Sequence, residues 1–206
     1  MTLKLLIESS LYFLALINPA SKIFLLSSMD PPLTWKELLA LSLKSNIAAL
    51  FILYVMTGLG SFLLKVVFQV DLYSLKVAGG IVLFIIGLTA VRQGRFYEKN
   101  TRDTHTDISI VPLAAPLIAG PGTMTAAIAY SSSNGEMVTL LSLTLALFVN
   151  FLVMLGSRGI GNVLERSSAT GPLIRITGLV VAAVAVQMIL GGLSEWMHST
   201  AGTMGK

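Results

Sequence analysis

The sequence has 206 residues, of which 54% are hydrophobic and 12% are charged, and its formal net charge is +4. A soluble domain carries about 25% charged residues, because it needs polar surface to cover its core. The composition therefore excludes an ordinary soluble domain and a disordered chain, and it predicts an integral membrane protein. Since the sequence contains no cysteine, it can form no disulfide and no thiolate metal site.

Six apolar segments of the sequence are predicted to cross the membrane as helices. A spanning helix needs about 17–25 mainly apolar residues, and four of the segments contain uncharged runs of 20, 28, 21 and 19 residues. Such continuous runs exclude a transmembrane β-barrel, whose strands alternate apolar and polar residues. In chain order, the expected spans are 3–29, 45–64, 72–91, 108–135, 137–157 and 176–194.

The first span is the least regular of the six. Glu8 and Lys22 interrupt it, and the dipeptide Asn18-Pro19 lies near its middle. Because Glu8 breaks the apolar region and no small-residue cleavage pattern precedes Lys22, we expect the segment to be retained rather than removed as a signal peptide.

The loop between the third and fourth spans sets the predicted orientation. It carries Arg95, Lys99 and Arg102, and Arg92 lies just before it. The positive-inside rule places these cations in the cytoplasm, so that both termini fall on the extracytoplasmic side. We therefore expect a multi-pass protein of the inner (plasma) membrane. A single short loop of mixed charge is not expected to bind nucleic acid.

The chain also divides into two halves of three spans each. Repeat 1 covers about 1–92, a cytoplasmic loop covers about 93–107, and repeat 2 covers about 108–196, all within one transmembrane domain. Short motifs recur between the halves: Leu41-Ser42-Leu43 returns as Leu141-Ser142-Leu143, and Lys76-Val77-Ala78-Gly79 resembles Arg175-Ile176-Thr177-Gly178. Because three is odd, the second half would be inverted in the membrane, an arrangement typical of transporters. The predicted fold is an all-α polytopic membrane protein with two inverted three-helix repeats.

The first and fourth spans each contain a helix break, at Asn18-Pro19 and at Gly120-Pro121-Gly122. Asn and Gly are suitable N-cap residues and Pro is favoured at the first helical position, so each break predicts the start of a half-helix. Its free N–H groups carry partial positive charge and favour an anion such as a substrate carboxylate. Carbonyl groups freed before the breaks, around Ala15-Leu16 and Ile118-Ala119, could bind a cation. Alternatively, both prolines only kink the helices.

Candidate substrate-binding residues gather at the two breaks. They are Asn18, Pro19, Ser21, Lys22, Gly120, Pro121, Gly122, Thr123 and Thr125. Lys22 lies one turn after Asn18, and it could contact an anionic substrate or extend to the membrane interface. Further polar residues within the spans are candidates for a cavity or for coupling, namely Glu8, Asn46, Asn150 and Gln187. The three amides could equally bond a neighbouring helix.

The acidic residues constrain how transport could be driven. Glu8 is the only carboxylate expected inside a span, so it is the one candidate proton carrier if transport is proton-coupled. Otherwise, a sodium site made of carbonyl groups, Asn18 and hydroxyls fits better. No cofactor is expected. Small residues at spacing four, including Gly178 and Ala182, allow close helix packing.

With these motifs in place, the sequence resembles the MarC family of membrane proteins. The resemblance rests on the Asn18-Pro19 break, on the run VPLAAPLIAGPG from Val111 to Gly122, and on six spans in about 200 residues. It implies an architecture related to the lysine exporter superfamily and transport of small neutral amino acids such as alanine and glycine, with a cation gradient as the drive.

The family motif maps onto nine positions of this chain: Asn18, Pro19, Ser21, Lys22, Pro116, Gly120, Pro121, Gly122 and Thr123. One departure follows the first break, where relatives often carry another proline and this chain has Ile23-Phe24. The helix after the break is therefore expected to be more regular here, and the substrate or the coupling could differ.

Other functions remain open at this point. The tripeptide Asn18-Pro19-Ala20 matches that of aquaporins, so a passive channel for small polar solutes is one alternative, although the second break contains no asparagine. An exporter of other small metabolites is another. An enzyme is not expected, because the sequence contains no HExxH, GxSxG or paired intramembrane aspartates. The expected partners are a small-molecule substrate and the lipid bilayer, and the sequence is compatible with a monomer or a homo-oligomer.

Overall fold

The computed structural model describes residues 3–27, 32–62, 66, 69–94, 118–166 and 170–204. Within these ranges the chain is all-helical, as predicted, and contains no strand. The helices are α1 (Leu3–Ile17), α2 (Pro19–Ser27), α3 (Trp35–Phe62), α4 (Leu72–Gln93), α6 (Pro121–Asn134), α7 (Glu136–Leu155), α8 (Ser157–Arg166) and α9 (Thr170–Met204).

Four of the described helices, α3, α4, α7 and α9, are long and apolar enough to cross a membrane. The pair α1 and α2 forms a fifth candidate span, which is bent by about 40° at its break. Of the expected span 108–135, α6 covers the second half, whereas 108–117 and most of the expected cytoplasmic loop lie outside the described residues. Six spans and an inverted repeat therefore stay predictions.

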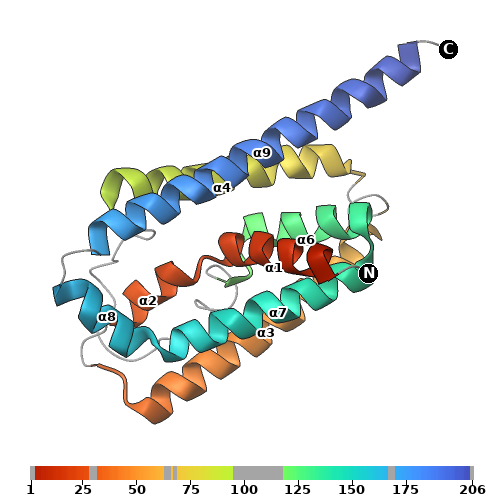
Figure 1. Cartoon of the computed structure of the whole chain (residues 1–206). Coiled ribbons are helices and arrows are strands. Elements are labelled where there is room, and N and C mark those ends of the chain that lie inside the picture. Colours follow the sequence, from red (N-terminus) through yellow and green to blue (C-terminus); the bar gives the residue numbers. More distant parts are fainter. Residues whose placement is uncertain are drawn as a thin grey trace.

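The helices form three layers (Figure 1). Helices α4 and α9 pack along each other as one layer, and α3 and α7 form a second. Between them lie the broken helix α1–α2 and the short helix α6: α6 contacts α3, α4 and α7, and α1 contacts α7 and α9. Both elements with predicted breaks are thus enclosed between two pairs of spanning helices.

Local sequence signals fix where two of the spans begin and end. The backbone N–H of Thr34 donates to the carboxylate of Glu37 at 2.7 Å, and the N–H of Glu37 donates back to the Thr34 hydroxyl at 3.3 Å. This capping box starts α3. Helix α4 ends before its C-cap Gly94, whose N–H donates to the carbonyl of Ala90 and whose left-handed φ of 67° turns the chain out of the helix.

The predicted close packing of small residues is confirmed between α4 and α9. A Cβ atom added to Gly87 would lie 2.7 Å from the backbone nitrogen of Ala182 and 2.8 Å from the carbonyl oxygen of Gly178. Any side chain at position 87 would therefore push the two backbones apart. The spacing of Gly178 and Ala182 on one face of α9 makes this approach possible.

Candidate functional site

The first helix break lies at Asn18, between α1 and α2. Asn18 adopts a φ of 54°, in the left-handed region that asparagine tolerates better than most residues. Its own N–H still closes α1 by donating to Leu14 at 2.9 Å. The N–H of Ser21, however, donates to the carbonyl of Asn18 at 3.1 Å rather than to Ile17, the acceptor of a continuous α-helix. The break thus frees the carbonyl of Ile17.

The ammonium group of Lys22 takes the place of the missing backbone donor. Its Nζ donates to the carbonyl of Ile17 and, at 3.3 Å, to that of Asn18. The residue is only 1% exposed, so its side chain turns back to the break instead of extending to the membrane interface. The sequence predicted that carbonyl groups around Ala15-Leu16 could bind a cation. In the structure, the Lys22 ammonium binds the carbonyl groups of the next two residues, Ile17 and Asn18.

The second break begins α6 with the predicted Gly-Pro pattern. Gly120 is the N-cap in an extended conformation, Pro121 is the first helical residue, and the N–H of Met124 donates to Gly120 at 2.9 Å. The N-cap Gly120 makes no side-chain capping hydrogen bond. The first N–H groups of a helix have no intrahelical acceptor, so those of Gly122 and Thr123 point out of the helix end. Both residues are buried.

The predicted binding residues at this second break differ in how far they are buried. Pro121 is exposed, and Gly120 is partly buried. Thr125 packs against α4, because a Cβ atom added to Gly79 would lie 2.5 Å from its hydroxyl oxygen. At the first break, Ser21 is buried and its hydroxyl donates to the carbonyl of Asn18 at 2.8 Å.

The two breaks lie at about the same depth in the protein. Helices α1 and α6 run side by side in opposite directions (Figure 1), and the hydroxyls of Ser9 and Tyr130 share a hydrogen bond between them. Asn18 follows Ser9 by nine residues, and Pro121 precedes Tyr130 by nine residues. Equal numbers of residues give equal helical rise. The structure therefore brings the two break regions, far apart in the sequence, to one level of the helix pair.

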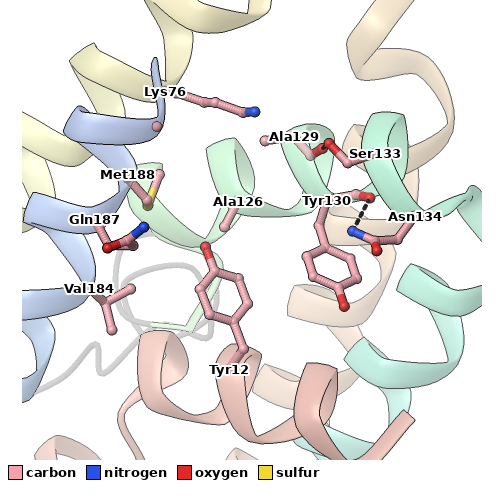
Figure 2. A pocket seen from close by; sticks show the side chains of 11 residues that line it. Tyr12, Lys76, Ala126, Ala129, Tyr130, Ser133, Asn134, Val184, Gln187 and Met188 are labelled. Carbon is pink, nitrogen blue, oxygen red and sulfur yellow. Dashed lines mark hydrogen bonds between the residues drawn. The ribbon is translucent and has the colours of Figure 1, made fainter. Parts of the chain in front are cut away.

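A cavity of about 180 Å³ extends from this helix pair toward the Lys76 end of α4. It lies between α1, α4, α6 and α9, and Figure 2 shows the hydroxyl of Tyr12 and the amide of Gln187 directed into it. At about 30 Å³ per water it has room for roughly six water molecules, well below the about 300–1,000 Å³ of drug-sized pockets. Its lining residues include Lys76, which pairs with Glu195 at the edge.

Among the predicted cavity residues, Gln187 lines this cavity and Glu8 does not. Glu8 is exposed on α1, and its carboxylate oxygen lies 3.8 Å from the Nζ of Lys4, one helical turn earlier. The sequence did not predict that Tyr12, Tyr130 and Lys76 line a cavity, although Lys76 lies in one of the repeated motifs. Tyr12 stacks on Tyr130 with ring centroids 5.9 Å apart. Neither tyrosine belongs to a recognisable sequence motif. Their shared role in the cavity wall becomes visible only when α1 packs against α6.

Asn46 and Asn150 bond each other rather than line a cavity. The amide of Asn150 donates to the side-chain oxygen of Asn46 at 2.9 Å, and that of Asn46 donates to the backbone carbonyl of Ser42 at 2.8 Å. Both residues are buried. The side-chain oxygen of Asn150 has no hydrogen-bond partner in the part of the chain that the structure describes. The pair therefore joins α3 to α7.

The asymmetry of this pair gives a prediction for stability. Asn46→Leu removes the oxygen acceptor of the Asn150 amide, whose N–H₂ group keeps only the Met154 sulfur at 3.3 Å while its oxygen stays without a described partner. Asn150→Leu leaves only the Asn46 oxygen unsatisfied. Since an orphaned buried polar group costs about 1–3 kcal/mol, we expect Asn46→Leu to destabilise by about 1 kcal/mol more than Asn150→Leu. Denaturant unfolding in detergent micelles measures both.

The double substitution should recover part of the loss, because no orphan remains. The matched control is Thr144→Val, which removes an exposed hydrogen bond to Tyr54 between the same two helices and should change little. Equal losses in both single variants would contradict the assignment of the two amides.

Comparison with known proteins gives the family. The chain matches the sequence model "MarC family integral membrane protein" over residues 3–197. It is similar to a UPF0056 membrane protein of Pyrococcus horikoshii, with 31% identity over 92% of this chain and 94% of the relative. A UPF0056 protein of Methanocaldococcus jannaschii is 33% identical over 87% of this chain and 91% of its own length. The UPF0056 protein YvbG of Bacillus subtilis is 28% identical over 87% and 89%.

No solved structure matches the chain. The family match spans both helix breaks and all the residues that line the cavity, and it confirms the resemblance drawn from the Asn-Pro break and the run ending at Gly122. The protein is a multi-pass integral membrane protein, and it belongs to the MarC family.

Proposed function

We propose that this protein is a secondary transporter of small neutral amino acids such as alanine and glycine, and that it binds them between the two helix breaks. The observation that carries the proposal is the common depth of the breaks on α1–α2 and α6. Two half-helix N-termini at one level offer free N–H groups and two positive dipole ends to one carboxylate. Two unrelated kinks would have no reason to share a level.

The residues around the breaks favour a small substrate. After Pro121, α6 continues with Gly122, Thr123, Ala126 and Ala127, all of them buried. Such small side chains would let a small amino acid come close to the backbone at the start of α6. The cavity, with space for roughly six waters, likewise excludes drug-sized solutes.

Alternating access requires two structural units that can rock against each other. In the predicted inverted repeat, α3 would be the counterpart of α7 and α4 the counterpart of α9. The two members of each pair pack along each other, so each outer layer would contain one helix of each repeat. The substrate would reach the breaks from the extracytoplasmic side through the cavity at Tyr12 and Gln187. Both termini lie on that side in the proposed orientation.

A passive channel for small polar solutes is the second candidate, because Asn18-Pro19-Ala20 matches the aquaporin tripeptide. An exporter of other small metabolites is a variant of the first. Counterflow separates a carrier from a channel. Liposomes containing the purified protein are loaded with unlabelled alanine, and entry of labelled alanine is followed with sodium and pH gradients set separately. We expect saturable counterflow. Entry that rises linearly with concentration would favour the channel, and no entry would reject alanine.

A substitution that fills the cavity tests the access route. Gly191 lines the cavity, and a Cβ atom added to it meets nothing within 4 Å. We expect Gly191→Phe to fold normally, to place its ring in the cavity and to reduce alanine counterflow at least about tenfold, about 1.4 kcal/mol. Gly191→Ala adds only a methyl group and is the control. Equal transport by both variants would show that the substrate takes another route.

A further inference from the structure

We propose that the ammonium group of Lys22 is a built-in cation, which fills a carbonyl site at the end of α1 that a free sodium ion would otherwise occupy. Transport by this protein would then need no sodium. The statement about transport rests on the function proposed above, whereas the occupancy of the carbonyl site can be tested on its own.

The carbonyl site is a product of the first helix break. The carbonyl of Ile17 loses its backbone donor because the N–H of Ser21 turns to Asn18. Both oxygens lie at the C-terminal end of α1, where the helix dipole is negative. In transporters with broken helices, such half-helix ends and unwound carbonyl groups are the places where sodium is held.

Lys22 occupies that place with a charged group of its own. Its Nζ donates to both Ile17 and Asn18, and the residue is 1% exposed. Lys22 also stands in the first turn of α2, at the positive end of that helix, where a cation is disfavoured. The side chain therefore gains by turning back to the negative end of α1. A sodium ion at the same carbonyl groups would meet an ammonium that already holds them.

Removal of the side chain should convert the filled site into an open one. In Lys22→Ala both carbonyl groups lose their cation. That of Ile17 is vacated, whereas that of Asn18 still accepts from the N–H and the hydroxyl of Ser21. We expect this variant to have a lower melting temperature than the native protein in choline chloride, and to regain about 2–4 °C or more when sodium chloride replaces choline at equal ionic strength. The native protein should show no difference between the two salts.

Two further variants separate a cation site from simple packing. Lys22→Met keeps an unbranched apolar stem in the space without a charge, so it should be destabilised and should not respond to sodium. Lys44→Ala removes an exposed lysine from α3 and should behave like the native protein in both salts. The measurements are melting curves of the purified proteins in detergent, repeated as alanine counterflow in liposomes with sodium or choline on both sides.

The outcomes decide the proposal separately from the transport function. Sodium-specific stabilisation of Lys22→Ala alone, together with sodium-independent counterflow of the native protein, supports it. Stabilisation or activation of the native protein by sodium overturns it, as does a Lys22→Ala variant that ignores sodium. If Lys22→Ala can be purified only in sodium chloride, that recovery supports the site, and if it can be purified in neither salt, the native comparison decides. Should the native protein not transport alanine, the melting curves still test the cation site.

Discussion

Gly87→Ala is expected to lower the melting temperature of the protein by roughly 3–10 °C, the equivalent of about 1–3 kcal/mol of overpacking. The new methyl group would lie 2.7 Å from the backbone nitrogen of Ala182 and 2.8 Å from the carbonyl oxygen of Gly178. Both neighbours are backbone atoms, so no side chain can rotate away, and α4 and α9 must separate along their contact. Thermal unfolding in detergent, followed by the loss of monodisperse protein on gel filtration, measures the effect.

Gly191→Ala provides the matched control on α9. It adds the same methyl group to a spanning helix, but nothing lies within 4 Å of it. Alanine is favoured over glycine inside a helix by up to about 1 kcal/mol, so this variant should be as stable as the native protein or more so. A larger series, Gly87→Val and Gly87→Leu, should lower the stability progressively. If Gly87→Ala and Gly191→Ala melt alike, α4 and α9 do not approach as closely as described.

The sequence was sufficient to predict the helical class, the breaks and the close packing of small residues. Apolar run length depends only on composition, and a proline in a span removes a backbone donor wherever it occurs. Thus Asn18-Pro19 and Gly120-Pro121 could be identified as helix breaks from the sequence alone. Similarly, Gly178 and Ala182 share a helix face because of the 3.6-residue period, and the structure confirms that another backbone approaches them.

What the sequence could not provide is the direction in which a long polar side chain turns. Lys22 had two open roles, and its ammonium donates to the carbonyl groups of Ile17 and Asn18 at the break, where Asn18 adopts a positive φ. Asn46 and Asn150 pair with each other because α3 and α7 are antiparallel in a particular register, which no local motif encodes. In the same way, the packing of α1 against α6 brings Tyr130 beside Tyr12, and both side chains line the cavity.

The charge balance at the first break follows from the same geometry. The positive N-terminus of α2 and the negative C-terminus of α1 meet head to tail at Asn18. With Lys22 on the carbonyl side, the negative end is neutralised from within the chain. In the proposed function, the positive end of α2 would receive the carboxylate of a zwitterionic amino acid. One bend of about 40° thus separates the carbonyl groups at the end of α1 from the proposed carboxylate site at the start of α2.

Substitutions of Asn18 are expected to separate the shape of the break from the chemistry of its side chain. Valine tolerates a φ of 54° poorly, and a left-handed L-residue costs about 1–2 kcal/mol, so Asn18→Val should lose stability as well as transport. Glycine adopts this φ freely, so Asn18→Gly should fold like the native protein. If the Asn18 side-chain amide binds the substrate, as its place among the candidate binding residues predicts, Asn18→Gly should still need about tenfold more alanine for half-maximal counterflow, since a hydrogen bond to a charged group contributes about 1.5–3 kcal/mol.

The control for this series is Gln69, the second non-glycine residue with a positive φ among the described residues, at 52°. It is exposed in the connection between α3 and α4, away from both breaks. Gln69→Gly relieves the same backbone strain without touching the proposed site, and it should leave counterflow unchanged. If Asn18→Gly transports alanine like the native protein while Asn18→Val does not, the amide binds nothing, and Asn18 serves only to hold the bend that exposes the N–H groups of α2. The carboxylate site would then consist of backbone alone, which would explain selectivity for the shared part of all amino acids and leave the choice of side chain to the small residues of α6.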